Sequence, residues 1–222
     1  MKARYYGIAA LLVVAVAAAF ALALPSLPAQ VPVHWNAMGR VDRLASPWTL
    51  FAVGPGAMAA VMALFALLPV LSPRRFELES FERTYLALML IIVGLLGYTF
   101  LVALQAGKHG TLDVPRALVG GLCVMSILLG NLLGKVRRNF YVGIRTPWTL
   151  ASERVWYATH RMGAKVIVAT GVIGLALIVA GVFPLVSAAI AIGGFMVPIV
   201  YSLVFYKRLE RAGELDVPAR AG

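Results

Sequence analysis

Six long apolar runs, separated by short polar segments, dominate the chain. Each has about 20 residues, which is the length an α-helix needs to cross the roughly 30 Å hydrocarbon core of a bilayer. Charged residues occur in these runs only at their edges, at Arg116 and Lys165. The predicted spans are residues 6–24, 50–71, 85–104, 115–134, 165–184 and 186–206.

This pattern predicts an all-α integral membrane protein, a bundle of six transmembrane helices. The composition supports it, because 61% of the 222 residues are hydrophobic and 13% are charged, against about half and a quarter in soluble domains. The chain then divides into 1–71 with two spans, 72–134 with two more, 135–206 with a motif-rich segment and the last two, and a tail at 207–222.

The basic residues predict how the bundle is oriented. Sixteen of the 20 Lys and Arg fall in the N-terminus, the segments 72–84 and 135–165, and the tail. Cytoplasmic loops are enriched in Lys and Arg, so we expect a multi-pass protein of the bacterial plasma (inner) membrane with both termini cytoplasmic and residues 25–49 outside. The net charge of +11 then reflects topology and contact with anionic headgroups, not direct binding of nucleic acid.

The first run has a second interpretation. Lys2 and Arg4 precede an apolar segment that ends in Ala21-Leu22-Ala23, which is also typical of a secretory signal peptide. A run of about 17 apolar residues exceeds the usual signal core and favours a retained anchor. Cleavage would leave five spans, and the sequence leaves this alternative open.

Small residues and one turn predict how the spans pack. Lipid gives helices no hydrophobic reason to associate, so close backbone approach at small residues supplies the contact. A tight turn near 184–187 predicts that the last two spans are antiparallel neighbours. The glycines expected to form packing notches are Gly94, Gly97, Gly130, Gly134, Gly171, Gly174 and Gly181.

Two nearly identical pentapeptides stand 100 residues apart: Ser-Pro-Trp-Thr-Leu at 46–50 and Thr-Pro-Trp-Thr-Leu at 146–150. Three predicted spans separate them, and an odd number of spans inverts orientation, so the pattern fits an inverted 3+3 repeat. The local alternative is that Ser or Thr caps a helix, Pro takes its first position and Trp lies at an interface. Both interpretations predict that a helix starts at each copy.

The outer segment 25–49 begins with three prolines in residues 25–32, which favour an extended backbone, and contains a predicted turn at 36–39. His34 could bind a cation or a peptide together with Asp42. Alternatively, His34 makes a local hydrogen bond while Trp35 anchors the loop at the headgroups.

We predict no metal site, because the three histidines lack a recognised ligand spacing. The candidate ligand-facing residues are His34, Trp35, Asn36, Gly39 and Asp42.

The inner segment predicts a short amphipathic helix, residues 147–162, at the cytoplasmic headgroup layer before the fifth span. Its apolar face would carry Trp148, Ala151, Val155, Thr159 and Met162, and its polar face Glu153, Tyr157, His160 and Arg161.

We expect Glu153 and His160 to fix the helix by an ion pair or hydrogen bond. Neither a nucleophile, a metal set nor a phosphate loop accompanies them, so we predict no enzyme and no cofactor. The candidate partner-facing residues are Asn139, Gly143, Arg145, Thr146, Trp148, Glu153, Trp156, His160 and Arg161.

Two patterns in these segments resemble the SdpI family of toxin-immunity membrane proteins. The outer one, P-x-H-W-N-x-x-G-x-x-D at 32–42, resembles that family's N-terminal domain of unknown function. The inner one, N-x-x-x-G-I-R-T-P-W-T-x-x-S-E-x-x-W-x-x-T-H-R at 139–161, is the more specific.

The resemblance implies a non-enzymatic protein that protects the membrane against a secreted toxic peptide. It also implies a cytoplasmic partner, an ArsR-like repressor held at the membrane, with the outer loop facing the toxin and the inner segment facing the repressor. The bilayer is the remaining implied partner, and association with a second copy stays open.

A small transporter or lipid-handling protein without ion coupling is the alternative function. The possible 3+3 repeat and the break at Gly54-Pro55-Gly56 favour it, since broken helices mark substrate sites in transporters. The absence of charged residues deep in any predicted span weakens it, because ion-coupled transport usually needs them.

Overall fold

A computed structural model of the chain describes residues 1–36, 38–71, 81–110, 112–139 and 141–215. Within them, six helical segments are long and apolar enough to cross a membrane, which confirms the predicted fold class. One of these spans, Pro47–Leu71, joins α2 to α3 through the π-helical turn η2. The elements are α1 Lys2–Ala23, η1 Leu24–Ser26, β1 Val31–Trp35, β2 Val41–Ala45, α2 Pro47–Phe51, η2 Ala52–Gly56, α3 Ala57–Leu71, α4 Glu82–His109, α5 Val114–Leu133, α6 Pro147–Ala151, α7 Glu153–Val179 and α8 Pro184–Arg211.

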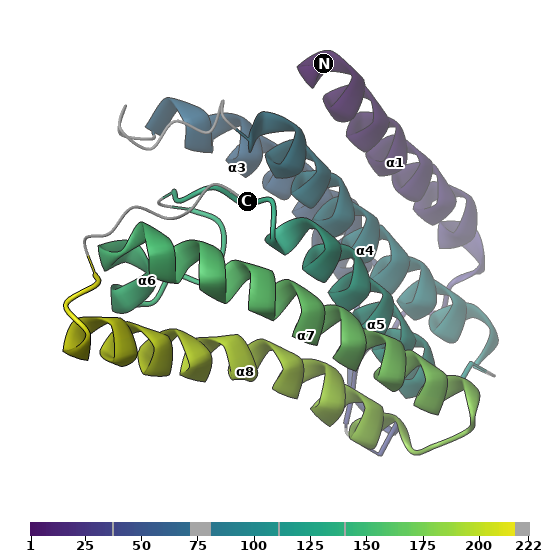
Figure 1. The fold of residues 1–222 in the computed structure, drawn as a ribbon. Helices are drawn as coiled ribbons and strands as arrows, with labels where there is room; N and C mark the ends of the chain where they lie inside the picture. Colours follow the sequence, from purple (N-terminus) through teal and green to yellow (C-terminus); the bar gives the residue numbers. More distant parts are fainter. Residues whose placement is uncertain (37, 72–80, 111, 140, 216–222) are drawn as a thin grey trace.

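The spanning helices form two groups of three. Helix α4 packs against α1 and α3, while α7 packs closely against both α5 and α8. The contact between α4 and α5 joins the two groups (Figure 1). This arrangement places the junction between the groups at the middle of the chain.

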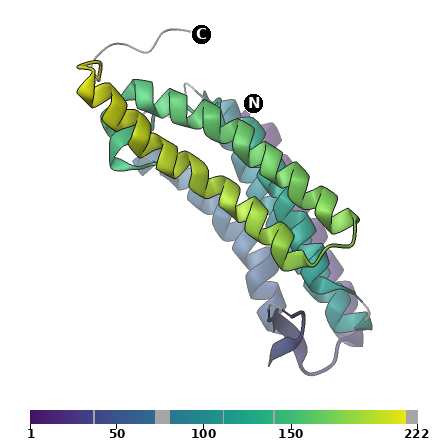
Figure 2. The ribbon, with the colours of Figure 1, turned by 60° about the horizontal axis from the view of Figure 1, so that its bottom comes forward.

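Two ion pairs mark one end of the bundle, and the hairpin marks the other. At one end, Lys2 Nζ lies 2.9 Å from Glu82 Oε1, and Arg154 Nη1 lies 2.7 Å from Glu214 Oε2. We call this the terminal end, because the start of α1 and the end of α8 both lie there. The β1–β2 hairpin lies at the opposite end, the hairpin end (Figure 2). Which end faces the cytoplasm remains the prediction made from the basic residues.

Glycines bring α5, α7 and α8 into close contact, as predicted for Gly171 and Gly174. A Cβ on Gly171 would lie 2.9 Å from Ile127 Cγ1 and 3.0 Å from the Cys123 carbonyl oxygen, both on α5. A Cβ on Gly174 would lie 3.1 Å from the Ser187 carbonyl oxygen on α8. The backbones of these helices therefore approach too closely for a larger residue.

The prediction of a packing role was wrong for Gly94 and Gly181. A Cβ on Gly94 would meet nothing within 4 Å. Gly181 follows α7 with a φ of +81°, and a Cβ there would meet nothing within 4 Å. It serves the turn, because glycine adopts positive φ without steric cost. The turn also precedes the predicted 184–187, since Pro184 is already the first residue of α8, where its missing N–H costs nothing.

Both Pro-Trp-Thr-Leu copies start a helix, as both interpretations predicted. The Ser46 hydroxyl accepts from the Trp48 amide at the start of α2, and the Thr146 hydroxyl accepts from the Thr149 amide at the start of α6. The first copy lies beside the hairpin, and the second contacts the end of α8 at the terminal end. The inverted repeat itself remains an interpretation.

We predict that Gly171→Ala destabilises the bundle by about 1–3 kcal/mol, because the added methyl group overpacks the α5–α7 contact. Thermal unfolding of the purified protein in detergent, followed by tryptophan fluorescence, measures this. Gly193→Ala is the matched control, since a Cβ there meets nothing within 4 Å. Equal melting temperatures for the two variants would contradict the close α5–α7 contact.

We predict from the charge distribution that the terminal end is cytoplasmic. Met38 is 72% exposed at the hairpin tip and Glu210 is exposed at the terminal end, so each suits a single-cysteine variant in a Cys123→Ala background. A membrane-impermeant maleimide should label Met38→Cys in intact cells and Glu210→Cys only after permeabilisation. The reverse pattern would invert the topology.

Candidate functional site

The outer segment folds into an antiparallel hairpin. Strand β1 pairs with β2, with Val31 opposite Ala45 and irregular register on both sides of His34. The Asn36 side-chain oxygen accepts hydrogen bonds from the Met38 and Arg40 amides, both at 3.0 Å. The turn predicted at 36–39 is therefore confirmed for the described residues, and the Asn36 side chain closes it.

Gly39 is required at the tip of the hairpin. Its φ is +78°, and a Cβ would lie 2.9 Å from Pro115 Cγ at the start of α5. Trp35 is half-buried against Val102 and Val114. The hairpin is therefore held against α4 and α5, with Trp35 packed on the bundle, and the role of Trp35 as a headgroup anchor stays a prediction.

His34 and Asp42 form the polar pair of the hairpin. His34 Nδ1 lies 2.5 Å from Asp42 Oδ1, and the two side chains are 57% and 42% exposed. Both remain accessible at the hairpin end. Among the described residues, no group of three or more His, Cys, Asp or Glu side chains could hold a metal ion.

At the terminal end, Asn139 organises the loop between α5 and α6. Its side-chain amide donates to the Arg137 and Val142 carbonyls at 2.8 and 2.9 Å, and its oxygen accepts from the Tyr141 and Val142 amides at 2.7 Å. The side chain is fully buried. These four hydrogen bonds pair backbone groups that are not paired within a helix or strand in this segment.

Trp156 and His160 on α7 fasten the same loop to the bundle. The Trp156 indole N–H donates to the Val136 carbonyl at 2.9 Å, and the two rings stack with centroids 4.1 Å apart. His160 Nε2 accepts from the Ile144 amide at 3.0 Å, and Nδ1 donates to the Trp156 carbonyl at 2.8 Å. Because Nε2 is an acceptor, this arrangement requires a neutral imidazole.

Gly143 makes room for the histidine. Its φ is +115°, and a Cβ there would overlap His160 Nε2 and lie 3.2 Å from the Trp156 ring. The residue before Ile144 therefore has to be glycine. Only glycine adopts this backbone conformation without strain, and only glycine leaves space for the His160 ring. The glycine of the inner motif is thereby explained by His160.

The Thr146 turn couples this loop to α8. Thr146 and Thr149 form a reciprocal capping box, and the Thr149 hydroxyl also donates to the Ile144 carbonyl at 2.8 Å. The Thr146 hydroxyl lies 3.2 Å from the Ser202 hydroxyl, and the Trp148 indole N–H donates to Ser202 Oγ. Ser202 thus ties the Pro-Trp turn to the last span.

The start of α7 also holds the chain after α8. The Ser152 hydroxyl accepts from the Val155 amide as the cap of α7 and lies 3.4 Å from the Leu215 carbonyl, to which it donates. Arg154 pairs with Glu214 at 2.7 Å. Residues 214–215 therefore lie against the inner motif.

The predicted amphipathic helix at 147–162 was wrong in its extent. Ser152 has extended backbone angles, φ −131° and ψ 125°, and separates α6 from α7. Residues 153–162 are then the first turns of a fifth span that begins at Glu153, well before the predicted 165. Trp148 and Val155 consequently belong to different helices and share no face.

The predicted pairing of Glu153 with His160 was also wrong. His160 is fully buried and bonds two backbone groups, whereas Glu153 is exposed at the start of α7. Helical spacing predicted that His160 lies on a polar face, but in the structure the His160 side of α7 is buried against the bundle. Arg145 and Arg161 are likewise exposed.

The candidate residues of the inner segment therefore fall into two sets. Asn139, Trp156 and His160 are buried, while Arg145, Glu153 and Arg161 are exposed. Thr149 and Ser152 have structural roles that the motif could have suggested, because both lie in its Thr-x-x-Ser portion. Ser202 also donates to the Ile199 carbonyl, but its role in the site carries no local signal, since Thr146 and Trp148 lie more than 50 residues away.

Comparison with known proteins agrees with the two motifs. Residues 135–202 match the model of the SdpI/YfhL protein family, and residues 11–59 match a domain of unknown function (DUF1648). Immunity protein SdpI of Bacillus subtilis (strain 168) is 29% identical over 147 residues, which are 66% of this chain and 68% of that protein. No solved structure matches.

The resemblance to the SdpI family is thus confirmed, and with six spanning helices the chain is a membrane protein. The two family matches coincide with the two sites. The first contains the Asn139 loop, Trp156, His160 and Ser202, and the second contains the β1–β2 hairpin and η2.

We predict that Gly143→Ala loosens the inner loop at a cost of about 1–3 kcal/mol, because it strains the backbone and displaces His160 from the Ile144 amide. Trypsin cleavage at Arg137, Arg138 and Arg145 should become faster in the purified protein. Gly134→Ala is the matched control, since its Cβ would make ordinary contact, 3.7 Å from Ala164 Cβ. Equal cleavage rates would contradict the role assigned to Gly143.

Proposed function

Because residues 135–202 are an SdpI-family segment in a protein with six spanning helices, we propose that this chain is an immunity membrane protein. It protects the membrane in which it lies against a secreted membrane-active peptide. The observation that carries the proposal is that both family motifs are built into ordered surfaces at opposite ends of one bundle. The proposed activity is non-enzymatic and uses no cofactor.

The hairpin is the proposed toxin-facing surface. His34 and Asp42 present an accessible donor and acceptor pair, 57% and 42% exposed, on a hairpin packed against the bundle. A preformed surface loses little conformational entropy on binding. Trp35, Asn36 and Gly39 act in this proposal by holding the pair in place.

The inner motif is the proposed surface for a cytoplasmic partner, an ArsR-like repressor. Arg145, Glu153 and Arg161 are exposed, and the buried network of Asn139 and His160 below them keeps the backbone in one conformation. Contact with nucleic acid would then be made by the repressor and not by this chain.

A small transporter or lipid-handling protein is a second candidate. The specific observation in its favour is the π-helical turn η2 in the second span, where Pro55 interrupts the α-helix and Gly54 lies directly against Phe100. Such turns occur frequently at functional sites. Uptake of a solute by proteoliposomes carrying the purified protein would favour this function over immunity.

We predict that expression of the chain protects a sensitive cell against a membrane-active peptide from a panel of secreted bacterial toxins. Survival curves against peptide concentration measure this. Replacing both His34→Ala and Asp42→Asn should reduce protection by about tenfold or more in peptide concentration, as expected when charge-assisted hydrogen bonds are lost. Lys108→Gln, an exposed change at the same end, is the matched control.

The inner surface is tested separately in the same cells. Arg161→Glu should abolish membrane recruitment of a fluorescently tagged repressor encoded beside the gene, while protection persists. Arg211→Glu makes the same charge change at an exposed position of the terminal end and should leave recruitment intact. Failure to protect against any peptide, with the protein present in the membrane, would refute the immunity proposal.

A further inference from the structure

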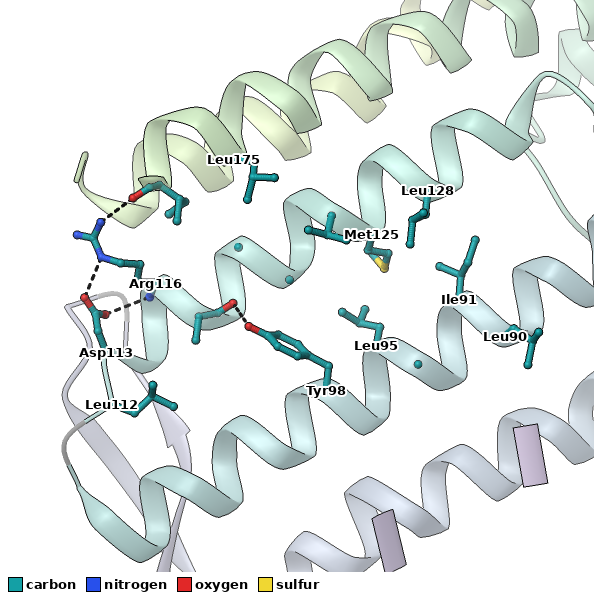
Figure 3. Close-up of a pocket in the computed structure, with 16 residues that line it drawn as sticks. Leu90, Ile91, Leu95, Tyr98, Leu112, Asp113, Arg116, Met125, Leu128 and Leu175 are labelled. Atoms are coloured by element: carbon teal, nitrogen blue, oxygen red, sulfur yellow. Dashed lines mark hydrogen bonds and ion pairs between the residues drawn. The ribbon is translucent and has the colours of Figure 1, made fainter. Parts of the chain in front are cut away.

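A groove of about 820 Å³ lies between α4 and α5, at the junction of the two three-helix groups, with α7 contributing Leu175 and Ile178 (Figure 3). Most of its lining is aliphatic side chains, methionine and glycine. The charged residues of the lining, Asp113 and Arg116, lie together at its hairpin end. The groove therefore has one polar end and a long apolar body.

The length of the groove matches one leaflet of a bilayer. Its lining runs along α5 from Arg116 to Leu128, and 12 residues of α-helix rise about 18 Å. One leaflet contributes about 15 Å, half of the roughly 30 Å hydrocarbon core. A chain that enters at the Arg116 end would thus follow the groove to the middle of the membrane.

The body of the groove contains free space. A Cβ on Gly94, which lines the groove from α4, would meet no atom within 4 Å. Acyl chains are the molecules that surround spanning helices, and an extended acyl chain is thinner than a helix, which is about 10 Å across. The apolar lining and its position along two spans therefore favour a lipid as the occupant.

The polar end complements a zwitterionic headgroup. Arg116 Nε lies 3.1 Å from Asp113 Oδ2, and Arg116 Nη1 donates to the Ile178 carbonyl at 2.8 Å. The side chains of Arg116 and Asp113 are 35% and 56% exposed. They lie at the first turn of α5 and beside the last turn of α7, the level at which lipid headgroups begin. A guanidinium binds phosphate, and a carboxylate binds an ammonium group.

We propose that the α4–α5 groove binds one molecule of phosphatidylethanolamine. An acyl chain fills the groove, the phosphate lies at Arg116 and the ammonium group lies at Asp113. The bound lipid lies along the α4–α5 contact that joins the two three-helix groups. This site is distinct from the hairpin and from the inner motif, so it does not depend on the immunity proposal.

Native mass spectrometry of the purified protein tests the site. Phosphatidylethanolamine, phosphatidylcholine and phosphatidylglycerol with identical acyl chains are added at equal concentration. The wild-type protein should retain one phosphatidylethanolamine with about tenfold preference, or about 1.4 kcal/mol, because the other two lack an N–H donor for Asp113. Equal retention of the three lipids would overturn the proposal.

Two variants assign the binding to the groove and to the charge pair. Gly94→Leu fills the groove and should reduce retention by about tenfold, whereas Gly193→Leu makes the same change on α8 at a position where a Cβ meets nothing within 4 Å and should not. Asp113→Asn keeps a good cap for α5 but should remove the preference for phosphatidylethanolamine over phosphatidylcholine.

Melting temperatures show which variants are folded. Unchanged retention in folded Gly94→Leu, or unchanged preference in folded Asp113→Asn, would refute the lipid site. A copurifying apolar peptide that is lost in Gly94→Leu while lipid retention stays constant would assign the groove to a peptide, and would also overturn it.

Discussion

Each backbone N–H and C=O group that leaves a helix or strand needs another hydrogen-bond partner, and this constraint shapes the hairpin turn and the inner loop. Side chains supply those partners in both segments. Asn36 closes the hairpin turn, Asn139 bonds four backbone groups of the inner loop, and His160 accepts from Ile144. The two family motifs are largely made of these residues. Much of their chemistry is therefore structural, and it leaves a smaller set of exposed residues for recognition.

Glycine has two separate roles in this bundle. In α7, Gly171 and Gly174 permit close approach of neighbouring helices, as expected where packing and not hydrophobicity drives association. At Gly39 and Gly143 a positive φ combines with a close neighbour, Pro115 in one case and His160 in the other. The second role is confined to the two motif segments, and it links each motif to the helix on which it packs.

The two motif surfaces and the groove occupy different parts of one framework. The hairpin packs on α4 and α5, the inner loop packs on α7 and α8, and the groove follows the α4–α5 contact that joins the two three-helix groups. A ligand in that contact would lie between the halves that carry the two motifs. This geometry makes the α4–α5 junction the natural place through which lipid binding could influence both ends.

The sequence by itself determined the membrane class, the number of spans, the helix starts at Pro47 and Pro147 and the turn at Asn36, because hydropathy, capping and turn residues act locally. It also located both family motifs. Tertiary structure decided which motif residues are buried. Helical spacing placed His160 on a polar face beside Glu153, whereas packing turned its ring toward Gly143 and Ile144.

Local pattern could not predict the hydrogen bond of Trp148 to Ser202 or the free space at Gly94 either. Each depends on a neighbour distant in sequence, and hydrophobic periodicity carries no information about which neighbour that is. The physical reason is that a span is specified by its own residues, while a site is specified by the contacts between spans.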